Sequence, residues 1–270
     1  MRRAPATLRV DEVGLRFGGL TALDNVSFSV GPGEICGLIG PNGAGKTSII
    51  NCISRTYLPQ HGQILLDGRN LLSLRRDQIS RSGVGRTFQN LGLFSNLSVL
   101  ENVLLGAHCR LRSGFLGASL QPPSVRREER QLRSEADELL GRFDLGDVAS
   151  SRVDELPYGT LKRVELARAL MGQPALLLLD EPAAGLTESE VVELGGLITE
   201  IRSHYGVTIL LVEHHMGMVL GISEKVVVLD FGRKLAEGVP SEVARLPEVI
   251  EAYLGQPAKP DDEDTAGGRT

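Results

Sequence analysis

The chain has 270 residues, 41% of them hydrophobic, which is enough for one large domain with a substantial core. Its formal net charge of −5 at pH 7 argues against a nucleic-acid-binding surface, which needs a basic surplus. Cys36, Cys52 and Cys109 are odd in number and form no CxxC pair, so we expect no disulfide framework and a reducing compartment. The N-terminus lacks a signal-like apolar segment, and no stretch approaches the roughly 20 apolar residues of a membrane span. Any membrane part is therefore expected on another polypeptide.

Apolar strands alternate with helices along most of the chain. Leu8–Phe17 and Val26–Val30 alternate apolar and polar residues, as half-exposed strands do. Helices are predicted at Thr47–Ser54 and Glu188–His204. Apolar runs predict further strands at Ile35–Ile39, Ile64–Leu66, Leu176–Leu179, Val207–Val212 and Val226–Leu229. This alternation indicates an α/β fold whose parallel sheet is covered on both faces.

The middle of the chain has a different pattern. No strand is predicted from Ser98 to about Val153, and Arg126–Gly141 reads as an amphipathic helix. Its arginines alternate with glutamates, which favours a solvated helix face over a nucleic-acid patch. We interpret Leu97–Val153 as a helical insertion with a loop at Ser113–Ser124. The tail Gln256–Thr270 contains no aromatic or branched aliphatic residue and is expected to be disordered.

A glycine-rich turn follows the apolar run Ile35–Ile39 and precedes a predicted helix. It fits G-x-x-x-x-G-K-[ST], the pattern of a loop whose backbone N–H groups bind phosphates at a helix N-terminus. Lys46 is placed to reach the outer phosphates, Thr47 to ligate Mg²⁺, and Ser48 to bind the α-phosphate. An accidental glycine turn is the alternative, and the flanking strand and helix argue against it. The nucleotide-binding residues predicted here are Gly40, Pro41, Asn42, Gly43, Ala44, Gly45, Lys46, Thr47 and Ser48.

Two adjacent acids follow the apolar run Leu176–Leu179. We predict that Asp180 holds the magnesium shell and that Glu181 orients and polarises the attacking water. For such a pair taken alone, the simpler alternative is that the acids cap the N-terminus of the next helix. Together with the phosphate loop upstream, the two acids indicate ATP hydrolysis.

The segment Leu156–Leu170 reads LPYGTLKRVELARAL and precedes these acids. It resembles the signature of ABC ATPases, LSGGQ followed by an arginine-rich helix ending in ARAL. Further positions follow in family order: Gln89 resembles the Q-loop glutamine, Ala184–Thr187 the D-loop, and His214 the switch histidine. The resemblance covers Leu8–Gly255. Within the superfamily the chain looks most similar to the ATP-binding subunits of high-affinity branched-chain amino acid uptake systems, the LivG type. Urea or short-amide importers are the near alternative, and lipopolysaccharide-export ATPases are more distant.

The resemblance implies the ABC ATPase fold: a RecA-like P-loop core with a mostly parallel sheet, an N-terminal antiparallel β subdomain and an inserted α-helical subdomain. The expected domain is 8–255, with the insertion at about 97–153. The resemblance also implies residue roles, with ATP and Mg²⁺ as cofactors. The catalytic residues are Glu181, His214 and Lys46, the metal ligands are Thr47, Gln89 and Asp180, and further nucleotide contacts are Phe17 (stacked on adenine), Gln89, Tyr158 and Gly159.

The partners follow from the same resemblance. In the family two such subunits meet head to tail, and each ATP lies between one phosphate loop and the other signature. A transmembrane permease contacts the helical insertion and the Q-loop, a solute-binding protein acts indirectly, and no nucleic acid is involved. The chain is then expected at the cytoplasmic face of the cell membrane, where it energises uptake of branched-chain or related amino acids.

Three positions depart from the family pattern. Pro157 replaces the signature serine, Thr160 the signature glutamine, and Thr187 the D-loop aspartate. These changes weaken the site built on this chain's signature and favour a paralogous partner subunit. A small-molecule P-loop kinase, an ABC ATPase acting on DNA or ribosomes, and a degenerate structural cassette are the rival interpretations. The signature, the single cassette without a basic surplus, and the intact Lys46 and Glu181 argue against each in turn.

Overall fold

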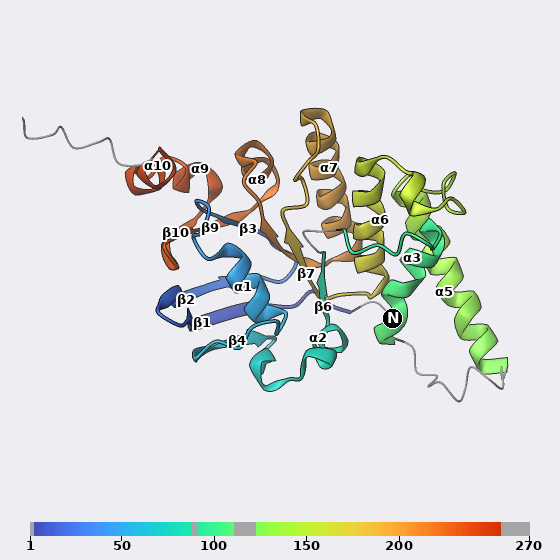
Figure 1. The fold of residues 1–270 in the computed structure, drawn as a ribbon, viewed down its shortest axis with the longest axis horizontal. Helices are drawn as coiled ribbons and strands as arrows, with labels where there is room; N and C mark the ends of the chain where they lie inside the picture. The colour runs from blue at the N-terminus through green and yellow to red at the C-terminus, as the bar shows by residue number, and fades with distance from the viewer. Residues whose placement is uncertain (1–2, 88–90, 111–122, 255–270) are drawn as a thin grey trace, which may run out of the picture.

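A computed structural model describes residues 3–87, 91–110 and 123–254 (Figure 1). Its larger sheet has six strands in the order β10-β9-β3-β8-β7-β6, and every neighbouring pair is parallel except β10 with β9. The strands are β3 (Ile35–Ile39), β6 (Val84–Arg86), β7 (Leu176–Asp180), β8 (Thr208–Val212), β9 (Lys225–Asp230) and β10 (Arg233–Gly238). The predicted mostly parallel sheet is confirmed.

A four-stranded antiparallel sheet lies beside it, in the order β2-β1-β4-β5. Its strands are β1 (Leu8–Phe17), β2 (Leu20–Val30), β4 (His61–Leu66) and β5 (Arg69–Asn70), followed by the short 3-10 helix η1 (Leu71–Ser73). The first strand has the predicted bounds, whereas β2 begins six residues before the predicted Val26. This sheet is the N-terminal antiparallel subdomain implied by the family resemblance.

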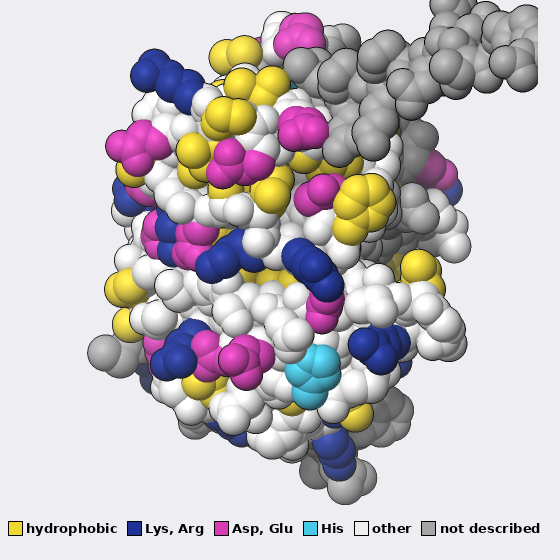
Figure 2. All heavy atoms as spheres, turned by 90° about the vertical axis from the view of Figure 1, so that its left-hand side faces the viewer, with side chains coloured by type: hydrophobic (Ala, Val, Ile, Leu, Met, Phe, Trp, Pro, Cys, Tyr) yellow, Lys and Arg dark blue, Asp and Glu magenta, His cyan; other side chains and the backbone are white. Residues whose placement is uncertain are grey.

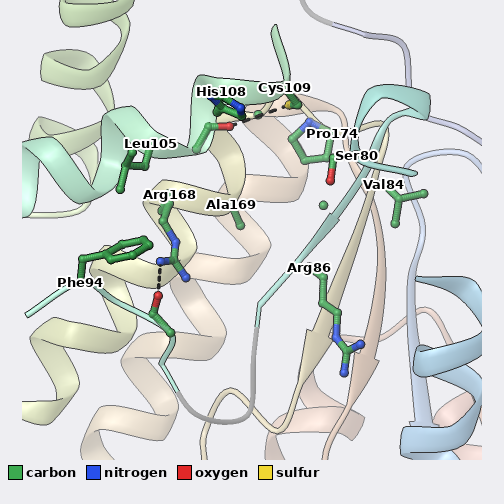
Figure 3. A pocket seen from close by; sticks show the side chains of 14 residues that line it. Ser80, Val84, Arg86, Phe94, Leu105, His108, Cys109, Arg168, Ala169 and Pro174 are labelled. Carbon is green, nitrogen blue, oxygen red and sulfur yellow. Dashed lines mark hydrogen bonds between the residues drawn. The ribbon is translucent and has the colours of Figure 1, made fainter. Parts of the chain in front are cut away.

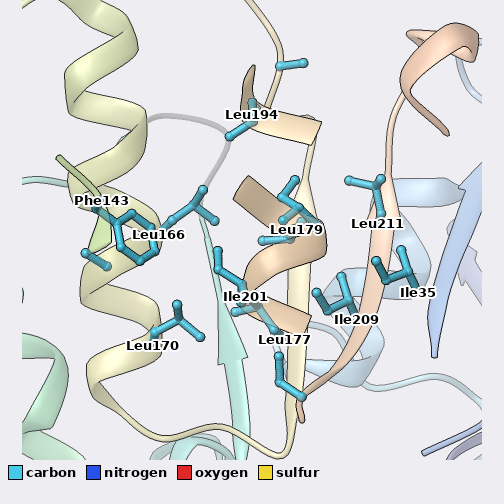
Figure 4. Close-up of a cluster of buried hydrophobic side chains, with 14 of the residues drawn as sticks. Ile35, Phe143, Leu166, Leu170, Leu177, Leu179, Leu194, Ile201, Ile209 and Leu211 are labelled. Carbon is cyan, nitrogen blue, oxygen red and sulfur yellow. The ribbon is translucent and has the colours of Figure 1, made fainter. Parts of the chain in front are cut away.

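Helices cover both faces of the six-stranded sheet. One face packs on α7 and α8, and the other packs on α1 and the antiparallel sheet (Figure 1). Side chains alternate along each strand: Leu177 and Leu179 join the first core, shown in Figure 4, while Leu176 and Leu178 join the second. All four are fully buried, as expected for a parallel strand covered on both faces. The helices around the sheet are α1 (Lys46–Ile53), α2 (Arg76–Ser82), α7 (Glu188–Tyr205), α8 (Met216–Ile222), α9 (Pro240–Val243) and α10 (Pro247–Leu254).

The described part of the predicted insertion is helical. It contains α3 (Val99–Leu105), η2 (Gly106–Arg110), α5 (Pro123–Arg142) and η3 (Val153–Glu155), and it leads into α6 (Tyr158–Met171). The predicted amphipathic helix falls within α5, which buries Ala136, Leu139 and Leu140. Most of the predicted loop 113–124, and all of the tail 256–270, lie outside the described residues.

Two cysteines behave as core residues. Cys36 and Cys52 are fully buried, and burial raises the pKa of the Cys52 thiol to about 12 and that of Cys36 further still. Both thiols therefore stay protonated and unreactive. Among the described residues, none of the helices combines the length and apolar character needed to cross a bilayer.

Candidate nucleotide-binding and hydrolysis site

Three neighbouring strands carry the predicted chemistry. β3, β8 and β7 run parallel and adjacent, with Leu38 opposite Val212 and Asp180 opposite Val212 in their registers. Their carboxyl ends therefore open at one edge of the sheet, where α/β proteins bind ligands. β3 leads into the phosphate loop, β7 ends at Asp180, and β8 leads to His214. The structure thus brings together residues that are up to 174 positions apart in the chain.

The phosphate loop depends on two glycines. Gly40 has φ 146°, and a Cβ at this position would lie 2.1 Å from the carbonyl oxygen of Leu229. Gly45 has φ 104°, and its Cβ would lie 2.8 Å from the carbonyl oxygen of Ala22. Only glycine fits such positions without moving the neighbouring backbone. The strands β9 and β2 thus shape the loop by close backbone contact.

The turn between β9 and β10 holds the loop as well. The Gly232 N–H donates to the carbonyl oxygen of Ala44 at 3.0 Å, and the Asp24 N–H donates to the Gly232 carbonyl at 2.8 Å. The loop is therefore anchored before α1 begins at Lys46. On the first turn of α1, Thr47 is exposed and Ser48 is half-buried, so both hydroxyl groups lie at the helix N-terminus.

Lys46 is held within the loop. Its ammonium group donates to the carbonyl oxygens of Gly40 at 2.7 Å and Pro41 at 2.8 Å. Burial lowers the pKa of Lys46, while the carboxylates of Glu181 and Asp180 act in the opposite direction. The lysine is therefore placed among the two predicted acids and the loop backbone, where a phosphate would meet its positive charge.

The two acids differ in their surroundings. Asp180 is only 2% exposed and forms an ion pair with Arg86, whose Nη2 lies 3.0 Å from Oδ2. Burial raises the pKa of Asp180, and Arg86 opposes that shift. Glu181 is half-buried and has φ 49°, a left-handed conformation that is uncommon for a residue other than glycine. Its N–H donates to the carbonyl oxygen of Val212 at 2.8 Å, which fixes the turn after β7.

The oxygen groups at this edge fit a magnesium ion. Thr47 supplies a hydroxyl and Asp180 a carboxylate, and Mg²⁺ takes few protein ligands because it keeps waters and substrate phosphates. Within the described ranges no three His, Cys, Asp or Glu side chains form a separate metal-binding group. The predicted third ligand, Gln89, lies outside the described residues.

A buried carboxylate, to which the sequence analysis gave no role, holds the backbone of the predicted switch histidine. Glu213 is fully buried, and its Oε1 accepts the Ala183 N–H at 2.7 Å. Its Oε2 accepts the N–H of His214 at 2.9 Å and of His215 at 3.3 Å. Glu213 thus ties the turn after β8 to the segment after the acids. His214 has a 54% exposed side chain, while His215 is half-buried.

Phe17 lies at the end of β1, and its ring is not a core ring. It is 45% exposed and contacts Tyr57 edge to face, with ring centroids 5.1 Å apart at 76°. Tyr57, which the sequence analysis did not single out, is 37% exposed. The exposed ring is free to stack on a base, and the edge contact fixes its orientation.

The signature residues lie elsewhere. α6 begins at Tyr158, with Pro157 at its N-cap. The ring of Tyr158 lies against the D-loop, 3.2 Å from where a Cβ of Gly185 would be, and the ammonium of Lys162 is 5.4 Å from its centroid. Figure 1 places α6 across β7 from α1. The structure therefore does not bring Tyr158 and Gly159 to the chain's own phosphate loop.

Comparison with known proteins gives two family matches and several close relatives. The family description "ABC transporter" matches residues 23–184, and "Branched-chain amino acid ATP-binding cassette transporter" matches residues 233–259. Over 249 residues the chain is 45% identical to the high-affinity branched-chain amino acid transport ATP-binding protein LivG of Escherichia coli (strain K12). The match covers 92% of this chain and 98% of that protein.

Solved structures show the same fold. The ADP conformation of an ATP-binding cassette of an ABC transporter superimposes with a TM-score of 0.81 at 30% identity, covering 93% of this chain and 99% of the other. A dimeric cassette in a post-hydrolysis state, bound to ADP and Pi, gives 0.72 at 25% identity, covering 86% and 98%. The chain therefore belongs to the ATP-binding cassette family of ABC transporters, as an ATPase whose relatives include branched-chain amino acid transport proteins.

Proposed function

We propose that this chain binds and hydrolyses MgATP to power uptake of branched-chain or related amino acids through separate transmembrane subunits. One observation carries the proposal. The carboxyl ends of three adjacent parallel strands lie at one edge of the sheet, and Lys46, Asp180, Glu181 and His214 come at or shortly after these ends. The amino acid substrate class rests on the relatives' names. The chain acts at the cytoplasmic face of the membrane.

Several residues of this chain have separate roles in ATP hydrolysis. The loop N–H groups and Lys46 bind the phosphates of ATP, and Phe17 stacks on the adenine. Glu181 accepts a hydrogen bond from the attacking water and polarises it towards the γ-phosphate. His214, exposed on its Glu213-anchored turn, donates to the γ-phosphate. Thr47 and Asp180 would hold Mg²⁺, with Gln89 as a further ligand, and the ion would supply positive charge to offset the charge that develops on the phosphate oxygens.

A second cassette completes the site. The signature end of α6 lies away from the phosphate loop of the same chain (Figure 1), so it is available to a partner's ATP. The dimeric cassette described above shows that this fold pairs. Because this signature lacks the serine hydroxyl at Pro157, we infer that the partner is a paralogue that carries it.

A groove beside β6 suits the permease. It has a volume of about 450 Å³ and lies between β6, η2 and α6 (Figure 3). Phe94 and Leu105 contribute apolar walls that are 58% and 42% exposed, and Arg168 and His108 contribute polar ones. An amphipathic segment of a transmembrane subunit would bury the apolar walls on docking. On the side of the molecule away from this groove, seen in Figure 2, acidic and basic side chains are interspersed, so that face offers no basic patch for a nucleic acid.

The test is isolation of the complex. The tagged chain is purified from its own membranes, the bound subunits are identified, and the complex is reconstituted into vesicles. We expect transmembrane subunits, a paralogous cassette, and ATP-driven uptake of labelled leucine or valine. Uptake of urea or a short amide instead would correct the substrate, and absence of any transmembrane subunit would overturn the transport role. A complex with Phe94→Ala, which truncates the groove wall, should lose the transmembrane subunits while the chain still hydrolyses ATP.

A further inference from the structure

Arg86 stands at the end of the edge strand β6, between the groove and the ATP site. Arg86 lines the groove, yet Figure 3 shows its side chain pointing away from Phe94 and Arg168 and towards α1. The Arg86 side chain is 15% exposed. This charged group therefore contacts residues inside the molecule and not the groove surface.

One guanidinium joins three elements. Its Nη1 donates to the side-chain oxygen of Asn51 and to the hydroxyl of Ser54, both at 2.8 Å and both within or next to α1. Its Nη2 donates to Oδ2 of Asp180 on β7 at 3.0 Å. The planar fork of arginine supplies several donors in fixed directions, which the single ammonium of lysine does not.

The elements that Arg86 joins are those that hold MgATP. α1 begins with Lys46 of the phosphate loop, and Asp180 is the carboxylate expected in the magnesium shell. The next residue strengthens the connection, because the Thr87 N–H donates to the Leu178 carbonyl at 3.0 Å and its hydroxyl accepts the Asp180 N–H at 3.4 Å. The end of β6 is thus fastened to the end of β7.

We propose that Arg86 is a positioning residue that orients the Asp180 carboxylate relative to α1 and links both to the groove wall. The ion pair uses Oδ2, which leaves Oδ1 for the magnesium shell. A displacement of β6 on docking in the groove changes the bonds of Arg86 and so the geometry of the site. This last step rests on the proposed function, whereas the orientation of Asp180 does not.

A plain structural ion pair is the alternative, and magnesium dependence separates the two. Groups that orient a metal ligand change metal affinity by about 10–100-fold when altered. If the ion pair only stabilises the fold, its loss lowers the melting temperature but leaves the magnesium dependence of the folded protein unchanged. The measurement is therefore ATPase rate against free Mg²⁺ at saturating ATP.

The main variant is Arg86→Lys in the full chain. The lysine keeps a positive charge near Asp180 but cannot also bridge to α1, so we expect the Mg²⁺ concentration for half-maximal activity to rise about tenfold. Affinity for ATP in EDTA should stay within about twofold, since the phosphate loop is untouched. Arg168→Lys is the matched control: its arginine lines the same groove, and its hydrogen bonds within the described residues go to the backbone carbonyls of Gly92 and Leu91. It should leave the Mg²⁺ dependence unchanged.

A second variant tests the same proposal in case Arg86→Lys does not fold. The double change Asn51→Ala and Ser54→Ala removes only the α1 contacts and leaves the Arg86–Asp180 pair. We expect it to raise the Mg²⁺ requirement by about threefold, less than the metal-ligand effect itself. A wild-type Mg²⁺ curve for folded Arg86→Lys and for this double variant would overturn the proposal.

The groove link is tested in the purified membrane complex. In that complex, Arg86→Lys should keep the transmembrane subunits bound but lose their stimulation of ATPase activity. Retained stimulation would overturn the link to the groove. If no transmembrane subunit is found at all, the proposed function fails, while the Mg²⁺ titration on the isolated chain still decides the role of Arg86.

Discussion

The phosphate-loop edge and the signature end of α6 differ in how closely they keep the family pattern. At the first, every predicted residue within the described ranges is the usual one, and close packing holds the loop glycines Gly40 and Gly45 in place. At the second, Pro157, Thr160 and Thr187 replace the residues expected there. In the proposed head-to-tail dimer, one ATP site would use this chain's phosphate-loop edge and the other its signature end. The difference within one chain would then become a difference between two sites.

The altered residues keep structural roles. Pro157, with φ −57° and ψ 150°, precedes the first turn of α6, where its missing N–H breaks no helix bond. The hydroxyl of Thr187 caps α7 and forms a capping box with Glu190. The signature end has therefore lost groups that would touch a nucleotide without losing its fold. This contrast leads us to expect large effects from changes at the phosphate edge and small ones at the signature.

The largest effect is expected at Glu181. Glu181→Gln removes the carboxylate that polarises water, and we expect turnover to fall by about 1,000-fold with ATP binding retained. The variant should also accumulate an ATP-bound dimer, because binding is uncoupled from hydrolysis. ATPase assays and size measurements with and without MgATP check both points. Turnover near that of the wild type would remove Glu181 from the mechanism.

The next effect separates two neighbouring histidines. His214→Ala should lower turnover by about 100-fold, the cost of losing one donor to the reacting phosphate. His215→Ala, the matched control, should stay within about twofold, although the N–H groups of both residues contact Glu213. Single-variant ATPase rates decide between them. The reverse pattern would show that the half-buried ring of His215 faces the phosphate.

A smaller effect is expected at the adenine platform. Phe17→Ala should weaken ATP binding by about 1–3 kcal/mol, the usual value of one base–aromatic stack. Tyr57→Phe keeps the ring that contacts Phe17 and should bind ATP as the wild type does. Nucleotide titration beside a melting curve makes the comparison. If Phe17→Ala lowers the melting temperature but the folded protein binds ATP normally, the ring is structural only.

The predictions from sequence were most accurate where the pattern is local. The strand Ile35–Ile39, the helix after the phosphate loop and the pair Asp180-Glu181 are each defined by adjacent residues, and the structure has them within one residue. Three strands were not predicted, β5, β6 and β10. All three are edge strands without a long apolar run, and no residue of β10 is fully buried, so none carries the periodic signal of a buried strand.

The contacts between distant residues could not be predicted. Arg86 pairs with Asp180 across 94 positions, and Glu213 accepts the Ala183 N–H across 30. No spacing rule connects such residues, because the pairing of β6 with β7 and of β7 with β8 brings them together. A charged residue at the end of a strand next to a motif was the available signal in both cases. The motifs thus predicted the ligand-binding groups, and the sheet topology showed which residues support them.

The smallest effect is expected at Pro157. A serine hydroxyl there would donate to the γ-phosphate of the partner's ATP, and a hydrogen bond to a charged group contributes about 1.5–3 kcal/mol. Part of this bond is recovered by Tyr158, which is 42% exposed beside Pro157, or by a water. Pro157→Ser should therefore lower the ATP concentration for dimerisation by about 3–10-fold.

Pro157→Ala lacks the hydroxyl and should match the wild type. Serine is also a good N-cap, so melting temperatures are needed to separate helix stability from nucleotide binding. Unchanged dimerisation and ATPase rates in Pro157→Ser, with two copies of this chain in the purified complex, would contradict the asymmetry between the two sites. Tighter dimerisation in Pro157→Ser alone would show that the signature end of this chain limits the strength of its ATP site.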